Sequence, residues 1–156
     1  MKDEEFNDEL IQKFPTILHD ALKDEKNKKQ FINTVSVRFS EITVFRALHK
    51  SDCIKDEDFE CDVIESQKYN RKLRIPYSIG CYSISVNEDI EQLKLSVKFP
   101  NHNRPLEGIA KGTMRCEYGP ADNILKKTHH NWYLFEKEIN NMKERFVLVK
   151  GEDCNG

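Results

Sequence analysis

Glycine is scarce in this chain, and none occurs before Gly80. A loop that cradles phosphate needs closely spaced glycines, so the first half of the chain contains no such loop, and the later glycines match no nucleotide-binding fingerprint. The sequence also lacks the Gly-x-Ser-x-Gly elbow of serine hydrolases and the His-Glu-x-x-His helix of zinc proteases. These absences argue against ATP hydrolysis, serine hydrolysis and zinc proteolysis.

The chain also lacks a large excess of charge of either sign, because it has 25 basic and 27 acidic residues and a net charge of −2. Such a balance gives neither the basic footprint of a nucleic-acid binder nor electrostatic attraction to a membrane. No uninterrupted apolar run is long enough for a transmembrane helix. The first residues, Met1–Glu5, lack the basic start and apolar stretch of a secretory signal. We therefore expect a cytoplasmic protein that binds neither nucleic acid nor membrane.

The cysteines do not form a recognisable framework. They are Cys53, Cys61, Cys81, Cys116 and Cys154, an odd number without any Cys-x-x-Cys pair. A complete set of disulfides cannot form from an odd number, and the spacing of a zinc knuckle is missing. We expect free thiols in a reducing compartment.

Apolar residues in the first part of the chain follow a helical period. Over residues 4–26 they recur every three or four positions, which predicts an amphipathic helix. Pro15 is expected to split this segment into two short helices, because proline suits a first turn better than a helix interior. The charged residues 23–29 are expected to form a solvated helix end and a loop.

From residue 34 onward the period changes to two, which indicates strands. Strands are expected at 35–39, 42–48, 79–86, 108–118, 128–136 and 145–149, with a short helix in 56–66 and a longer one in 87–98. Strands that mostly follow one another favour an antiparallel or mixed sheet. We therefore expect a single α+β domain over residues 1–150, with N-terminal helices packed on a mixed, mostly antiparallel sheet of five or six strands, followed by a flexible tail over 151–156.

Arg46 is the first candidate functional residue. It shares a predicted strand face with Val44, while Phe45 lies on the other face. An arginine between two apolar faces keeps its proton and therefore needs a partner. The alternatives are an internal ion pair, a strand-end arginine that reaches water, and a clamp for the phosphate or carboxylate of a ligand. We expect the internal ion pair, with Glu136 or another acid.

Two serines form the next candidate. Ser83 and Ser85, with Cys81, make a small polar face on the predicted strand 79–86. Such a face is usually an exposed polar side opposite a buried one, and this is the expected role. The alternative is a ligand pocket in which the serine hydroxyls orient the ligand.

Glu136 and Glu138 form a Glu-x-Glu at the end of the predicted strand 128–136. Exposed glutamates at a strand end are common, and we expect such a charged end here. The alternative is a catalytic carboxylate that polarises a hydroxyl or stabilises a developing cation.

The same strand carries His129, His130 and Trp132, the only tryptophan. Alternation sends the two histidines to opposite faces, so they cannot chelate one metal together. Large rings on both faces predict a strand that is buried on both sides. The histidines at its start are therefore cleft candidates, and Trp132 is a third.

Taken in chain order, these elements resemble a known enzyme series. Arg46, the run Ser83–Ser85 and the run Glu136–Glu138 are similar to the arginine, serine-x-serine and glutamate-x-glutamate elements of ADP-ribosyltransferase-like enzymes. The resemblance implies that Arg46 holds an NAD phosphate, that Ser83 shapes a nicotinamide pocket and that Glu136 activates the transfer. The middle threonine usual in that family is replaced by isoleucine.

Two functions follow as hypotheses. The preferred one is a small non-catalytic protein-interaction module, such as an immunity, antitoxin or defence-system accessory protein, which needs no cofactor and has another protein as its partner. The alternative is an NAD-consuming ADP-ribosyltransferase or glycohydrolase built on Arg46, Ser83 and Glu136. The enzyme requires these three side chains to converge in one pocket, whereas the interaction module predicts that they are separated and that an exposed apolar patch occurs elsewhere.

Overall fold

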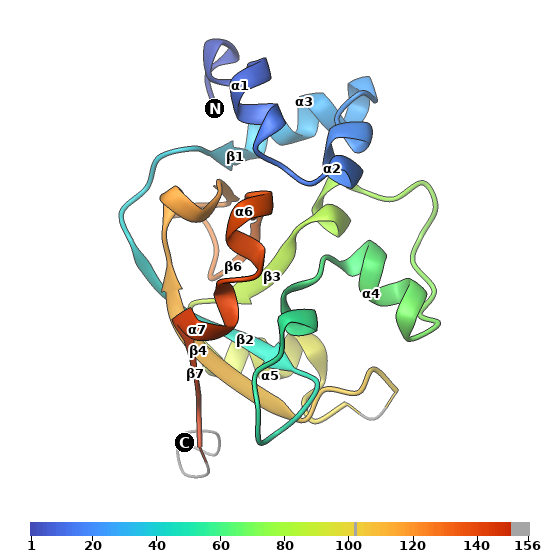
Figure 1. Cartoon of the computed structure of the whole chain (residues 1–156), viewed down its shortest axis with the longest axis vertical. Coiled ribbons are helices and arrows are strands. Elements are labelled where there is room, and N and C mark those ends of the chain that lie inside the picture. Colours follow the sequence, from blue (N-terminus) through green and yellow to red (C-terminus); the bar gives the residue numbers. More distant parts are fainter. Residues whose placement is uncertain (102, 151–156) are drawn as a thin grey trace.

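The structure is a computed structural model that describes residues 1–101 and 103–150. Its strands form one sheet of seven strands in the order β1-β5-β6-β3-β2-β4-β7, and every neighbouring pair is antiparallel (Figure 1). The strands are β1 (Val35–Ser36), β2 (Ile42–Leu48), β3 (Ile84–Asn87), β4 (Gly108–Met114), β5 (Ala121–Asp122), β6 (His129–Trp132) and β7 (Phe146–Leu148). Helices together with this sheet confirm the α+β class.

Two details of the predicted sheet are wrong. The described sheet contains no parallel pair, and it has seven strands rather than five or six. The additional strand is β5, which has only two residues and pairs with β1 and β6. A two-residue strand carries too little alternation to be recognised from its sequence.

The N-terminal region is helical, as predicted, and Pro15 lies immediately before a new helix. Asn7 caps the first α-helix by accepting a hydrogen bond from the Leu10 amide, and Asp24 caps a third helix in the same way. The helical segments are η1 (Asp3–Glu5), α1 (Asp8–Gln12), α2 (Thr16–Ala21) and α3 (Glu25–Thr34). Because α3 begins at Glu25, the loop predicted over 23–29 is wrong.

The other helices connect the strands. They are η2 (Asp56–Phe59), α4 (Asp62–Lys68), η3 (Ile79–Tyr82), α5 (Ile90–Val97), η4 (Cys116–Tyr118), α6 (Glu136–Ile139) and α7 (Met142–Arg145). The short helix in 56–66 and the helix in 87–98 are therefore present. Within the described ranges, no helix is both long enough and apolar enough to cross a membrane.

Three of the predicted strands are partly replaced by helix. Residues 79–82 form η3 instead of the first half of a strand, and Cys116–Tyr118 forms η4 beyond the end of β4. The strand predicted over 128–136 ends at Trp132, so Glu136 and Glu138 lie in helix α6. The tail predicted over 151–156 lies outside the described residues.

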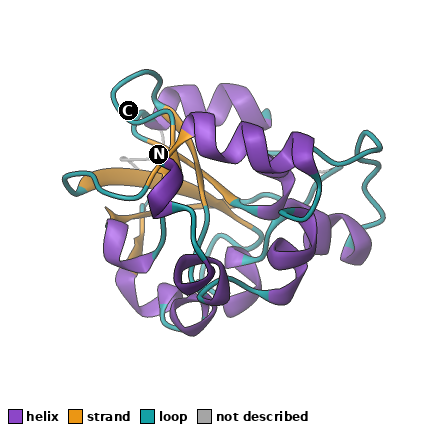
Figure 2. Cartoon of the chain, turned by 90° about the horizontal axis from the view of Figure 1, so that it is seen from above, coloured by secondary structure: helices purple, strands orange, loops and turns teal. Residues whose placement is uncertain are grey.

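The sheet is covered on both faces (Figure 2). On one face, Val44 and Trp132 pack with Phe59 of η2 and Met142 of α7. On the other face, Leu93 of α5 packs with residues of β2 and β4. Residues of β2 therefore alternate between two cores, as predicted for a central strand.

The N-terminal helices form a third core at one end of the sheet (Figure 1). Phe14 and Phe31 pack against each other, and Phe31 contacts Tyr133 edge-on with ring centroids 4.9 Å apart. Phe135 and Ile79 complete this core. The helices therefore pack mainly on η3 and on the chain after β6, and Val35 of β1 is part of the same core, so the predicted packing on the sheet is met only in part.

Gly112 provides a test of packing in the sheet. It pairs with Phe146 across β4 and β7, and a Cβ atom added there would lie 2.7 Å from the Phe146 ring. We expect Gly112→Ala to destabilise the protein by about 1–3 kcal/mol through overpacking, measured by urea unfolding. A smaller partner should relieve the clash, so Gly112→Ala should cost much less in a Phe146→Leu background. Equal costs in the two backgrounds would contradict this account.

Candidate functional site

Arg46 is buried in the centre of the sheet, with 4% of its surface exposed. Its Nε donates to the Asp58 carbonyl at 2.9 Å, and its Nη1 donates to the Ser85 carbonyl at 2.9 Å. Burial lowers the pKa of Arg46, although a guanidinium stays charged at neutral pH. No carboxylate forms an ion pair with Arg46 in the described ranges. The predicted ion pair with Glu136 or another acid is therefore wrong, and backbone carbonyls take its place.

A buried carboxylate lies close to Arg46. Glu65 of α4 accepts hydrogen bonds from Arg71 at 2.7 Å and from Nε and Nη2 of Arg104 at 2.6 and 3.1 Å. Asp62 adds a longer contact of 3.5 Å to Arg104. We call Asp62, Glu65, Arg71 and Arg104 the Glu65 cluster. It joins α4 to the loop that follows it and to the loop that precedes β4.

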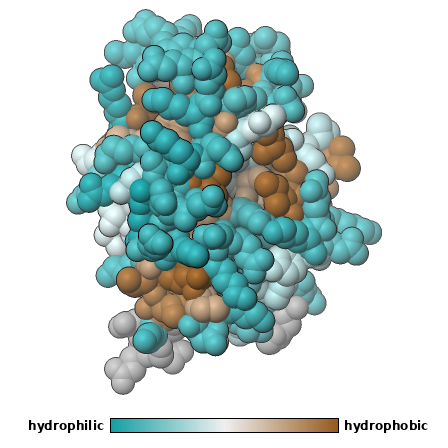
Figure 3. All heavy atoms as spheres, in the orientation of Figure 1, coloured by the Kyte–Doolittle hydropathy of each residue, from teal (hydrophilic) through white to brown (hydrophobic). Residues whose placement is uncertain are grey.

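Ser83 and Glu136 lie on a different part of the molecule. Both line a groove of about 200 Å³ between α2, α4 and α6, which we call the apolar groove. Its other lining residues are mostly apolar: Pro15, Ile17, Phe59, Ile64, Tyr82, Ile84, Trp132, Leu134 and Ile139, together with Glu60 and Cys61. In Figure 3, which has the orientation of Figure 1, hydrophobic residues (brown) reach the surface near the centre of the view. The Ser83 hydroxyl donates to the Gly80 carbonyl at 2.6 Å and is buried.

Arg46, Ser85 and His129 meet at another cavity. This inner cavity has a volume of about 160 Å³ and lies between the sheet and α5. Arg104 lines it as well and also lines a larger hollow of about 640 Å³ at the surface. Arg46 therefore does not line the cavity that Ser83 and Glu136 line. The structure brings Arg46 together with Ser85, and Ser83 together with Glu136.

The two histidines lie on opposite sides of β6, as predicted from alternation. His130 is fully buried, and its Nδ1 donates a hydrogen bond to the Asp122 carbonyl at 2.7 Å. Its Nε2 lies 2.7 Å from the Glu88 carboxylate. His129 is half-buried, and burial lowers its pKa. His130 is thus held by two internal partners, whereas His129 faces the inner cavity.

The polar groups of Trp132 and Glu138 both bond to other residues of the chain. The Trp132 indole nitrogen donates to the Gly119 carbonyl at 2.9 Å, and its ring forms part of the floor of the apolar groove. Glu138 forms a 2.6 Å ion pair with Arg145, whose guanidinium stacks on Tyr118 at 3.7 Å. Glu138 is therefore occupied by a cation of the chain itself.

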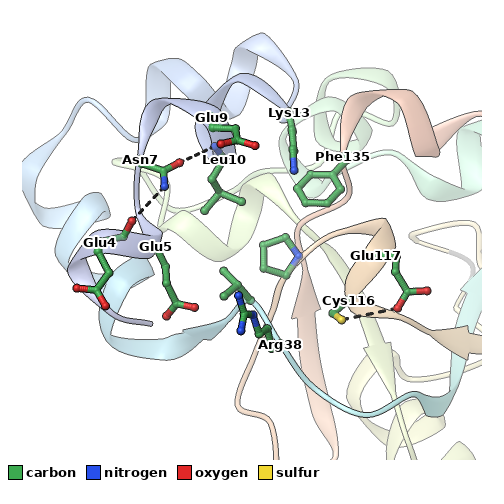
Figure 4. A pocket seen from close by; sticks show the side chains of 12 residues that line it. Glu4, Glu5, Asn7, Glu9, Leu10, Lys13, Arg38, Cys116, Glu117 and Phe135 are labelled. Carbon is green, nitrogen blue, oxygen red and sulfur yellow. Dashed lines mark hydrogen bonds between the residues drawn. The ribbon is translucent and has the colours of Figure 1, made fainter.

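A fourth space, a hollow of about 490 Å³, lies between the N-terminal helices and η4 (Figure 4). Carboxylates surround it, and two cations accompany them: Glu4, Glu5, Glu9 and Glu117, with Lys13 and Arg38. Lys13 lies over the Phe135 ring at 5.4 Å from its centroid. The acids of this hollow are exposed or half-exposed, so water solvates them.

Two residues of the Glu65 cluster could not be identified from the sequence as functional candidates. Glu65 and Arg104 are 39 positions apart, and no local pattern links them. A partial signal existed in the acidic segment 56–66 followed by the basic segment 67–76, which contains Arg71. A basic run of this kind favours an exposed loop, and nothing in it indicates that Arg71 pairs with a buried acid.

The described residues contain no cluster of three or more histidine, cysteine or acidic side chains that could hold a metal ion. Comparison with known proteins finds no family, no curated protein and no solved structure that matches the chain. The function is therefore inferred from the geometry of these sites. The roles assigned to Arg46, Ser83 and Glu136 from the sequence stay predictions.

The Glu65 cluster predicts a pH dependence of stability. Burial alone would raise the pKa of Glu65, but hydrogen bonds from Arg104 and the charges of the nearby arginines lower it from 4.5 to about 2. A carboxyl with a lowered folded-state pKa stabilises the protein above its unfolded pKa, and this contribution is lost as pH falls from about 4.5 to 2. The shift corresponds to about 3 kcal/mol.

We therefore expect Glu65→Gln to be less stable than the parent at pH 7, and the difference to shrink as pH falls toward 2. The measurement is urea unfolding of both proteins across this range. Glu57→Gln is the matched control, because Glu57 lies nearby without an ion pair among the described residues. A difference between parent and Glu65→Gln that stays constant down to pH 2 would refute the assignment.

Proposed function

We propose that this chain is a non-catalytic protein-interaction module that binds a partner protein through the apolar groove. The supporting observation is the groove itself. Four half-buried apolar side chains form its mouth, and large buried side chains form its floor; the mouth consists of Ile17, Ile64, Tyr82 and Ile139. Exposed apolar surface of this kind is costly in water and commonly marks an interaction site.

The dimensions of the groove favour a single anchoring side chain. Its volume of about 200 Å³ lies below the roughly 300–1,000 Å³ of pockets that hold whole drug-sized ligands. A buried aromatic or branched side chain is the usual centre of a protein–protein interface. Trp132 and Phe59 on the floor offer large apolar area to such an anchor.

The rim of the groove indicates the charge of the partner. Glu60 and Glu136 line the groove, and no cation forms an ion pair with Glu136 in the part of the chain that the structure describes. Glu60 is paired with Lys68 at 2.6 Å. A partner segment with an apolar anchor next to a lysine or arginine would match both features. An immunity protein, an antitoxin or an accessory protein of a defence system acts in this manner, by occupying another protein.

The position of Arg46 also supports a non-catalytic role, whereas Ser83 and Glu136 line the apolar groove together and do not lie away from it as expected. An ADP-ribosyltransferase would need Arg46, Ser83 and Glu136 around one NAD molecule, whereas these residues line two different cavities. The Ser83 hydroxyl is already bonded to the Gly80 carbonyl. Arg46 is held by two backbone carbonyls.

The test measures partner binding with groove variants. A partner is first captured from the source organism's lysate and purified, and its affinity is then measured by calorimetry. We expect Ile64→Lys to weaken binding by about tenfold or more, because it places a charge where the anchor is buried. Ile75→Lys is the matched control, since Ile75 is 80% exposed and does not line the groove.

Two results would overturn the proposal. One is an unchanged affinity in a folded Ile64→Lys variant. The other is the release of nicotinamide from NAD by the parent protein, lost in an Arg46→Ala variant with an unchanged melting temperature. The second result would establish the transferase instead.

A further inference from the structure

The contact between β2 and β3 is unusually short. The two strands are neighbours in the sheet, but their paired register is limited to Phe45 opposite Asn87. The next ladder, between β2 and β4, extends over the whole of both strands. Beyond Phe45 the Arg46 side chain joins the strands by donating Nη1 to the Ser85 carbonyl. The inner cavity lies at this interruption, on the side covered by α5.

Four polar side chains with unused hydrogen-bonding capacity line the inner cavity. Arg46 makes no hydrogen bond through Nη2 to any described residue, and Arg104 makes none through Nη1. The Ser85 hydroxyl and the His129 ring likewise have no hydrogen-bond partner within the described ranges. None of these polar atoms is completely buried, so a ligand that accepts hydrogen bonds can reach all four side chains from the cavity.

The charge of Arg46 points to an anion. Its own partners are the neutral carbonyls of Asp58 and Ser85, which accept hydrogen bonds without neutralising the guanidinium. Glu65, the acidic group with the largest electrostatic effect on Arg46, already accepts three hydrogen bonds from Arg71 and Arg104. A buried cation without its own counterion is unfavourable, and a bound anion would supply one.

The larger hollow continues this chemistry toward the surface. It shares Arg104 with the inner cavity and is lined also by Arg71, Lys98, Asn101 and Asn103. We call it the basic hollow, because it has three cationic residues and no acidic residue among its described lining. Glu65 and Asp62 contact these arginines without lining either space. If one anionic group of a ligand lay in the inner cavity, a second anionic group of the same ligand would contact cationic side chains in the basic hollow.

We propose that the inner cavity and the basic hollow together bind a small soluble molecule with two neighbouring phosphate groups. The inner phosphate contacts Arg46, Ser85 and His129, and the outer phosphate contacts Lys98 and Arg104. Guanidinium groups match phosphate oxygens with paired hydrogen bonds, and a tetrahedral phosphate can accept donors that converge from several directions. The inner cavity, at about 160 Å³, has room for a phosphate group.

The probes are inorganic phosphate and pyrophosphate, titrated into the full chain by calorimetry at constant ionic strength. We expect pyrophosphate to bind with one-to-one stoichiometry and at least about tenfold more tightly than phosphate, because it can contact both spaces. Ser85→Ala should weaken both anions by a similar factor. Lys98→Asn should weaken pyrophosphate roughly tenfold and phosphate much less, because only the outer group contacts Lys98.

Each variant has a matched control. Ser83→Ala removes a hydroxyl two residues away that lines the apolar groove, and Lys94→Asn removes a charge from α5 outside both spaces. Both controls should bind pyrophosphate as the parent does. The comparison of Lys98→Asn with Lys94→Asn tests the site without any substitution of the buried Arg46.

Three results would overturn the proposal. One is a parent protein that does not bind pyrophosphate, because the proposed site would then not exist. Binding that is unchanged in both Ser85→Ala and Lys98→Asn would place the anion elsewhere. A single-stranded oligonucleotide that binds more tightly than pyrophosphate and competes with it would assign the cations to a nucleic acid instead.

Discussion

The carboxylate of Glu65 positions both candidate sites of this protein. Only 2% of the residue is exposed, and its oxygens accept hydrogen bonds from Arg71 and from two nitrogens of Arg104. These bonds fix α4 against two loops that have no regular structure of their own. Helix α4 supplies Ile64 to the apolar groove, and the two arginines line the basic hollow. Loss of the buried charge would therefore disturb both surfaces, because an unpaired arginine is costly in a buried place.

Arg46 has the second structural role. Where the ladder between β2 and β3 is interrupted, its guanidinium takes the place of main-chain donors and bonds the Ser85 carbonyl. A buried carbonyl needs a donor, and an arginine can provide one across a wider gap than a backbone amide can. Because the Arg46 side chain joins the strands here in place of the backbone, a cavity is left beside the sheet and a positive charge lies next to it. The stability of the sheet and the proposed anion site thus arise from one residue.

The sequence predicted the elements with strong local patterns and failed where long-range contacts decide. The central strand β2 was found because apolar residues occupy both of its faces, and the opposite orientation of the two histidines followed from alternation. The helical conformation of Glu136 could not be foreseen, since the apolar run before it continues the strand pattern. The partners of Arg46 are carbonyls of Asp58 and Ser85, and a carbonyl is present at every residue, so composition offers no signal for them.

The run Ser83–Ser85 shows why closeness in sequence did not define a site. Ser83 lies just before β3 and lines the apolar groove. Ile84, the first residue of β3, packs in the core that contains Trp132 on this side of the sheet. Ser85 lines the inner cavity on the opposite side of the sheet. Consecutive strand residues point to opposite faces, so β3 separates the two spaces and contributes to both. A series of short motifs can therefore match an enzyme in order while its members are distributed over two cavities. In this fold the arrangement favours two binding surfaces, one apolar and one cationic, over a single catalytic centre.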